Sequence, residues 1–149
     1  MRRALALAAA RGGETAPNPA VGCVLVRDGR VVAEAATAPG GRPHAEEQAL
    51  AAAGAGAAGA TAYVTLEPCG ARSTPGTVSC ADRLASAGIS RVVIAAADPS
   101  PFASGRGPQR LEAAGVAVAS GVLQVEAEAL IHDWLRYQAL DPPPVEGSR

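Results

Sequence analysis

Two short groups of residues could carry metal chemistry. They are Pro43-His44-Ala45-Glu46 and Pro68-Cys69, with Cys80 following eleven positions after Cys69. Zinc readily binds imidazole nitrogen and thiolate sulfur, and a catalytic zinc site keeps a fourth position for water. His44, Cys69 and Cys80 therefore predict a Zn²⁺ site with three protein ligands and one open position.

Glu46 is the candidate catalytic residue of this group. It lies two positions after His44, which on a helix places it about 200° around the axis, a poor angle for a second metal ligand. Zinc lowers the pKa of water toward about 7, so Glu46 could take a proton, let hydroxide attack an amine-bearing ring carbon, and return the proton to the departing amine. The pattern predicts hydrolytic deamination with ammonia as the leaving group.

The elements that must position these residues can be predicted from local patterns. Residues 3–10 favour a helix, and two β-rich runs flanking Asp28-Gly29 predict a hairpin with a type I′ turn. The strands are expected at Val21–Arg27, Arg30–Ala35, Thr61–Leu66, Arg91–Ala96 and Val116–Ala119, and later helices at His44–Ala53, Cys80–Ala87, Gln109–Ala114 and Val122–Leu140. This order predicts a three-layer α/β/α domain with a mixed central sheet.

Both candidate groups lie where a predicted strand gives way to a helix. Loops at that edge of an open α/β sheet converge on one crevice, where ligands bind. The positive end of a helix dipole also favours the thiolate form of a cysteine at a helix start. The expected fold would thus assist metal binding.

Composition limits the classes of partner. The 149 residues are 48% hydrophobic, which fits one domain over residues 1–140, followed by a tail at 141–149 that we expect to be disordered. A formal net charge of −1 and 3% aromatic residues give no sign of a nucleic-acid surface. No apolar stretch reaches the roughly 20 residues needed to cross a membrane. We expect a small, diffusible substrate.

Three scattered cysteines do not form a disulfide framework, and their odd number fits a reducing cytoplasm. The Ala-rich start could be mistaken for a signal peptide. It ends at Arg11-Gly12 and leads directly into a segment that the fold needs. We therefore expect a cytoplasmic protein.

The same residues carry a resemblance to a known family. His44-Ala45-Glu46 with Pro68-Cys69 and Cys80 resembles the zinc-deaminase signature. A wider match resembles the deaminase domain of bifunctional riboflavin-biosynthesis enzymes, from about Arg2 to Trp134, and includes Pro17-Asn18-Pro19-Ala20-Val21-Gly22-Cys23-Val24, Thr65-Leu66-Glu67-Pro68-Cys69, Arg91-Val92-Val93 and Asp98-Pro99.

The resemblance implies a cytidine-deaminase-like fold and a homodimer or larger homo-oligomer. It also implies a diamino-hydroxy-pyrimidine substrate that carries a ribosylamino 5′-phosphate. In that family the asparagine matching Asn18 contacts the pyrimidine, and the aspartate matching Asp98 helps to hold the ribose-phosphate end. The chain ends after the last predicted helix, so we expect any reduction to need a separate protein.

The segment between the cysteines departs from the family pattern. Residues 70–75 stand where the family usually has a Ser-His pair and a basic residue before Thr-Pro, and the segment is two residues longer. Ser100 stands where the family usually has asparagine. We expect Arg72 to replace the lost basic contact with the substrate.

Two other functions stay open at this point. One is deamination of another amino-heterocycle, such as a nucleoside or purine base, although relatives of that kind use a shorter Pro-Cys-x-x-Cys spacing. The other is a closed structural zinc site with Cys23 or His132 as the fourth ligand. Glu46 argues against the second, because a structural site needs no adjacent carboxylate.

Overall fold

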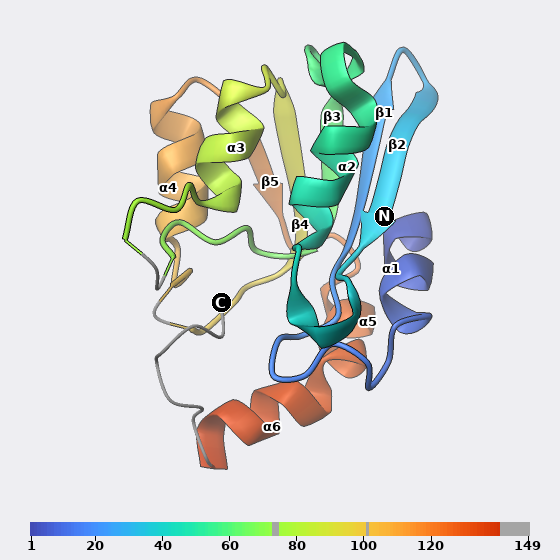
Figure 1. The fold of residues 1–149 in the computed structure, drawn as a ribbon, viewed down its shortest axis with the longest axis vertical. Helices are drawn as coiled ribbons and strands as arrows, with labels where there is room; N and C mark the ends of the chain where they lie inside the picture. Colours follow the sequence, from blue (N-terminus) through green and yellow to red (C-terminus); the bar gives the residue numbers. More distant parts are fainter. Residues whose placement is uncertain (73–74, 101, 141–149) are drawn as a thin grey trace.

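A five-stranded mixed sheet forms the frame of the protein (Figure 1). The computed structural model describes residues 1–72, 75–100 and 102–140, with side chains described through residue 136. The strand order is β2-β1-β3-β4-β5, and the strands are β1 (Gly22–Arg27), β2 (Arg30–Ala36), β3 (Thr61–Leu66), β4 (Arg91–Ala96) and β5 (Ala117–Ser120). β1 is antiparallel to both of its neighbours, whereas β3, β4 and β5 are parallel.

The β1–β2 hairpin forms as the sequence predicts. Asp28 and Gly29 have φ values of 51° and 74°, the pair of positive φ angles that a type I′ turn requires. The next strands, β3 and β4, read as nearly continuous apolar runs because helices cover both of their faces.

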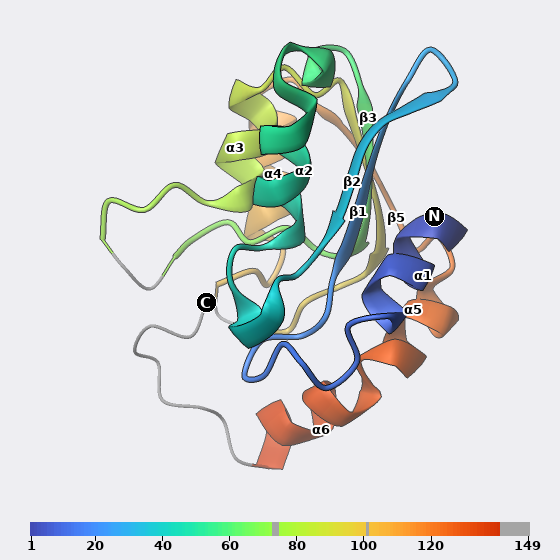
Figure 2. The ribbon, with the colours of Figure 1, turned by 45° about the vertical axis from the view of Figure 1, so that its right-hand side comes forward.

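Helices form a layer on each face of the sheet (Figures 1 and 2). On one face lie α2 (Ala45–Ala53), α3 (Cys80–Ser86) and α4 (Arg106–Ala113), and on the other lie α1 (Arg2–Ala9) and α5 (Gln124–Leu130). Two short 3-10 helices, Pro39–Gly41 and Gly54–Ala57, flank α2. This arrangement confirms the predicted three-layer α/β fold with a mixed sheet.

The hydrophobic core lies between the sheet and these two layers. Leu25, Val64 and Ile94 from the sheet are buried, as are Leu84 of α3 and Leu111 of α4. The Ala-rich faces of α1 and α2 are buried as well, at Ala4, Ala8, Ala45 and Ala49. Small side chains let these helices approach the sheet closely.

The prediction of one helix over Val122–Leu140 is wrong. The chain forms α5 and then α6 (His132–Leu140), with a break at Ile131, whose φ and ψ are −108° and 11°. Ile131 stays buried in the core, and the change of direction lets Trp134 Nε1 donate a hydrogen bond to the Pro17 carbonyl oxygen at 3.1 Å. Burial of Ile131 and this distant contact outweigh local helix propensity.

The start of α4 also differs from the prediction. The helix begins at Arg106, three residues before the expected start, with Pro108 in its first turn. Proline is tolerated there because the first backbone N–H groups of a helix have no partner within it. The tail at residues 141–149 lies outside the described residues. Among the described helices, none is both long and apolar enough to cross a membrane.

The topology gathers several chain segments at one edge of the sheet. The carboxyl ends of β3 and β4 lie there, together with the start of the antiparallel β1 and the end of β2. The segments that follow or precede those strand ends carry Asn18, His44, Cys69 and Asp98.

Close packing of α4 against one of these segments gives a first prediction. A Cβ atom on Gly107 would lie 2.0 Å from the Pro68 carbonyl oxygen, one residue before Cys69. We expect Gly107→Ala to lower the free energy of unfolding by about 1–3 kcal/mol, because the helix must move away from that backbone. Urea denaturation measures the change.

Gly56→Ala is the matched control for Gly107→Ala. Its Cβ would find no atom nearer than Val32 Cβ at 3.9 Å, so its stability should stay within about 0.5 kcal/mol of the parent. Equal stability of the two variants would contradict the close packing of α4 on Pro68.

Candidate active site

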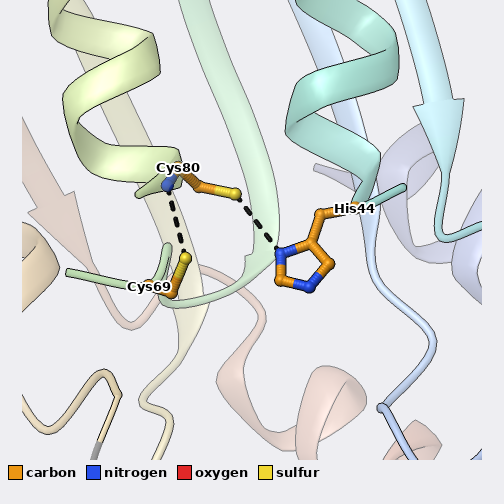
Figure 3. A group of neighbouring side chains, drawn as sticks. All are labelled: His44, Cys69 and Cys80. Carbon is orange, nitrogen blue, oxygen red and sulfur yellow. Dashed lines mark hydrogen bonds between the residues drawn. The ribbon is translucent and has the colours of Figure 1, made fainter. Parts of the chain in front are cut away.

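Three elements bring His44, Cys69 and Cys80 together (Figure 3). His44 is the N-cap residue of α2, Cys69 lies in the loop after β3, and Cys80 is the first residue of α3. Their candidate ligand atoms all lie within 4.8 Å of one another, and Cys80 Sγ is 3.4 Å from His44 Nδ1. Among the described residues, this is the only such cluster of three or more His, Cys, Asp or Glu side chains.

Backbone hydrogen bonds hold the start of α3 against the Cys69 loop. The Cys80 N–H donates to Cys69 Sγ at 3.3 Å, and the Ala81 N–H donates to the Cys69 carbonyl oxygen at 3.1 Å. Ser79 caps the helix, since its hydroxyl accepts from the Asp82 N–H. The positive end of α3 therefore faces the Cys69 sulfur, which favours a thiolate there.

The donor set fits zinc. Tetrahedral coordination at the usual bond lengths would place a sulfur and a nitrogen ligand about 3.6 Å apart. The observed 3.4 Å between Cys80 Sγ and His44 Nδ1 is close to that separation. One imidazole and two sulfurs from separate elements are also the ligand types that zinc prefers.

The two sulfurs differ in their ease of ionisation. Hydrogen bonding from the Cys80 thiol lowers the pKa of Cys69, with further help from His44 and the Cys80 N–H. The hydrogen bond to Cys69 and burial raise the pKa of Cys80 well above its usual range. The pair thus holds one thiolate readily, and a second negative charge there needs a cation.

Glu46 lies beside these ligands in the first turn of α2. The residue is only 4% exposed, and burial raises the pKa of its carboxyl group, although His44 acts in the opposite direction. It lines a cleft together with His44 and Cys69. The remaining lining residues are Asn18, Pro19, Val21, Thr37, Leu66 and Glu67. A buried carboxyl group next to a ligand cluster can accept and return a proton.

Asn18 presents an unused acceptor in the same cleft. Its Nδ2 donates to the Gly41 carbonyl oxygen at 2.8 Å, and Thr15 Oγ1 donates to the Asn18 carbonyl oxygen. Asn18 Oδ1 is buried and has no hydrogen-bond partner among the described residues. Because such atoms are costly when unpaired, a ligand with an N–H donor would be favoured here.

Asp98 is buried but is not among the described residues that line the cleft. Its Oδ1 accepts from the Ser100 N–H at 2.8 Å, and its own N–H donates to Glu67 Oε2 at 3.0 Å. Its contact with a ribose-phosphate group stays a prediction.

Glu67 is a site residue that the sequence reasoning did not select. Its two oxygens accept from the Asp98 and Gly105 N–H groups, so it fixes the loop between β4 and α4 while lining the cleft. An acidic residue directly after a buried strand was the available signal.

The Arg72 side chain contacts all three residues of the ligand cluster. Its Nη1 donates to Glu47 Oε1 at 2.8 Å and also lies 3.3 Å from His44 Nδ1, 3.8 Å from Cys80 Sγ and 3.9 Å from Cys69 Sγ. None of these contacts tests the predicted role of Arg72 in binding substrate, which stays a prediction.

Neither proposed fourth ligand belongs to the cluster. Cys23 is a fully buried core residue of β1, and burial raises the pKa of its thiol. His132 is exposed on α6, with Nδ1 3.5 Å from Asp133 Oδ1. The described ligand set therefore has three members, and a four-coordinate zinc held by them would take its fourth ligand from outside this set.

A mixed sheet covered on both faces carries at one edge a histidine and two cysteines that could bind zinc, with a glutamate two residues after the histidine. This arrangement is typical of the zinc-binding deaminases. Residues 1–96 match the family model described as the cytidine and deoxycytidylate deaminase zinc-binding region. The chain belongs to this family.

Comparison with individual proteins shows which relatives this chain is similar to. The chain is 48% identical to the riboflavin biosynthesis protein RibD of Escherichia coli over 136 residues, which cover 91% of this chain and 36% of the relative. It is 44% identical over 128 residues to the diaminohydroxyphosphoribosylamino-pyrimidine deaminase of Buchnera aphidicola, with 86% of each chain covered.

A solved structure of a related protein is also similar to this chain. The diaminohydroxyphosphoribosylaminopyrimidine deaminase/5-amino-6-(5-phosphoribosylamino)uracil reductase of Thermotoga maritima is 40% identical and superimposes with a TM-score of 0.84. The match covers 92% of this chain and 39% of that one. The chain thus spans well under half of the length of the RibD relative and of this two-activity protein.

The ligand cluster gives a second prediction. We expect the parent protein to bind one zinc per chain and Cys80→Ala to bind it at least about 100-fold more weakly, since even outer contacts of zinc ligands are worth about 10–100-fold. Competition with a chromogenic chelator measures the affinity.

Cys23→Ala is the control, because it removes a buried sulfur from outside the cluster. It should lose some stability from the cavity but keep the zinc affinity of the parent. If Cys23→Ala lost zinc while Cys80→Ala retained it, the ligand assignment would be wrong.

Proposed function

We propose that this chain catalyses hydrolytic deamination of a diaminohydroxyphosphoribosylaminopyrimidine, a step of riboflavin biosynthesis. The observation that carries the proposal is the buried Glu46 carboxyl group beside His44, Cys69 and the cleft. The names of the Escherichia coli and Buchnera aphidicola relatives support the substrate.

The residues of the cleft have distinct roles in this proposal. His44, Cys69 and Cys80 hold the zinc, which when bound supplies the Lewis acidity that brings the pKa of water to about 7. Glu46 takes a proton from the attacking water and delivers it to the departing amine. One C–O bond forms, one C–N bond breaks, and the reaction consumes water and releases ammonia.

Asn18 orients the pyrimidine ring in this proposal. Its unpaired Oδ1 would accept a hydrogen bond from a ring or amino N–H group of the substrate, and its Nδ2 is already held by Gly41. Glu67 lines the cleft and holds the loop that carries Asp98, and Asp98 would serve the ribose-phosphate end.

We extend the proposal to the setting of the enzyme. Residues 1–140 would form the deaminase domain, acting in the cytoplasm on a small molecule and as a homodimer or larger homo-oligomer. A reductase activity would be supplied by another polypeptide segment or protein.

The acid–base role gives a third prediction. Glu46→Gln keeps the shape of the side chain but removes proton transfer, so kcat should fall by at least about 10²–10⁴-fold while zinc content and melting temperature stay near those of the parent. Ammonia release from the phosphoribosylaminopyrimidine substrate measures kcat, and chelator competition measures zinc.

Glu112→Gln is the control, since Glu112 is exposed on α4 away from the cleft. It should leave kcat unchanged. A panel of cytidine, deoxycytidylate and purine bases tests the substrate: faster turnover of one of these would assign another amino-heterocycle. No ammonia from any of them or from the phosphoribosylaminopyrimidine would favour a structural zinc module.

The unpaired side-chain oxygen of Asn18, Oδ1, gives a fourth prediction. Asn18→Ala removes an acceptor that the proposal pairs with substrate, so KM should rise by about tenfold or more with a smaller change in zinc affinity. Steady-state ammonia release measures KM. Gln109→Ala, at an exposed position of α4, is the control and should keep the parent KM, whereas an unchanged KM in Asn18→Ala would remove Asn18 from the binding site.

A further inference from the structure

Arg72 places a positive charge against all three candidate zinc ligands. We propose that Arg72 competes with zinc for these ligand atoms and so lowers the zinc affinity of the chain. The inference rests on the proposed function insofar as His44, Cys69 and Cys80 bind the metal, and it adds a regulator of loading to that site.

The distances make the competition specific. Guanidinium nitrogens donate hydrogen bonds and never accept them, so His44 Nδ1 accepts in its 3.3 Å contact with Arg72 Nη1 when the imidazole carries its proton on Nε2. The same nitrogen lies 3.4 Å from Cys80 Sγ, so it is the imidazole atom that would bind a metal shared with that sulfur. One lone pair cannot serve an N–H donor and a metal at the same time.

Glu47 anchors the guanidinium in this position. Its carboxylate accepts from Arg72 Nη1 at 2.8 Å, and the Arg72 side chain is only 4% exposed. Arg72 Nε is buried and has no hydrogen-bond partner among the described residues. A buried cation with unused donors is costly, so its acceptors must hold it there. Among the described residues, these acceptors are Glu47 and the zinc ligands themselves.

Entry of zinc must therefore rearrange Arg72. The hydrogen bond to His44 Nδ1 has to break, and the two contacts with sulfur at 3.8 and 3.9 Å have to lengthen or weaken. The Glu47 anchor would still keep a positive charge near the ion, which raises the free energy of the bound state. Both effects lower affinity, whereas without zinc the same contacts offset negative charge on the sulfurs.

Arg72 belongs to the segment between Cys69 and Cys80 in which this chain departs from the family pattern. The competing cation lies only three residues beyond the ligand Cys69.

The test is the zinc affinity of purified, zinc-stripped full-length chains that carry Arg72→Gln or Arg72→Met. Methionine keeps an apolar stem in the buried position, so at least one variant should fold. We expect zinc to bind about tenfold or more tightly to both, as loss of a charge-assisted competitor implies, and the melting temperature of the metal-free protein to fall. Chelator competition and thermal unfolding measure the two quantities.

Arg110→Gln is the matched control. It also removes one positive charge near α3, where Arg110 pairs with Asp82 at 2.9 Å on the exposed surface, but it touches no ligand. Its zinc affinity should equal that of the parent. Unchanged or weaker zinc binding by the Arg72 variants would overturn the competition. Failure of the parent to bind zinc would instead overturn the proposed function, so the two failures are distinguishable.

Discussion

The hydrogen bond from the Cys80 N–H to Cys69 Sγ joins the start of α3 to the loop after β3, and the site depends on it. Cys69 and Cys80 are separated by a segment without helix or strand among its described residues, so local structure alone does not bring them together. The junction does so, and α4 supports it from behind through the close approach of Gly107 to the Pro68 carbonyl oxygen. Packing at this point therefore fixes the distance between two sulfurs.

Much of the frame was predictable because its signals are local. Asp28-Gly29 specifies the type I′ turn through the positive φ angles that both residues adopt, and apolar runs identify β3 and β4. The ligand trio was predictable for a different reason: zinc accepts few side-chain types, and their order matched a known signature. Neither inference needed a distant contact.

What the sequence did not reveal depends on contacts between distant residues. The division of the last helix follows from burial of Ile131 and from the hydrogen bond of Trp134 to Pro17, which no helix propensity records. Glu67 gained its role because two backbone N–H groups, more than thirty residues further along, converge on its carboxylate. Hydrogen bonds of this kind are specified by tertiary packing, so a local pattern could name Asp98 but not the residue that positions it.

Charge balance links the site to its neighbours. Glu46, Glu47 and two cysteine sulfurs bring negative or ionisable groups to one partly buried region, and burying uncompensated charge is costly. In the described contacts the compensating cation is Arg72, whose Nη1 reaches Glu47 and all three ligands. Zinc would compensate the sulfurs directly and leave Arg72 to Glu47. Among the described contacts, the guanidinium would keep Glu47 as an acceptor while its contacts with the zinc ligands break or weaken, so the site can stay close to neutral with or without the ion.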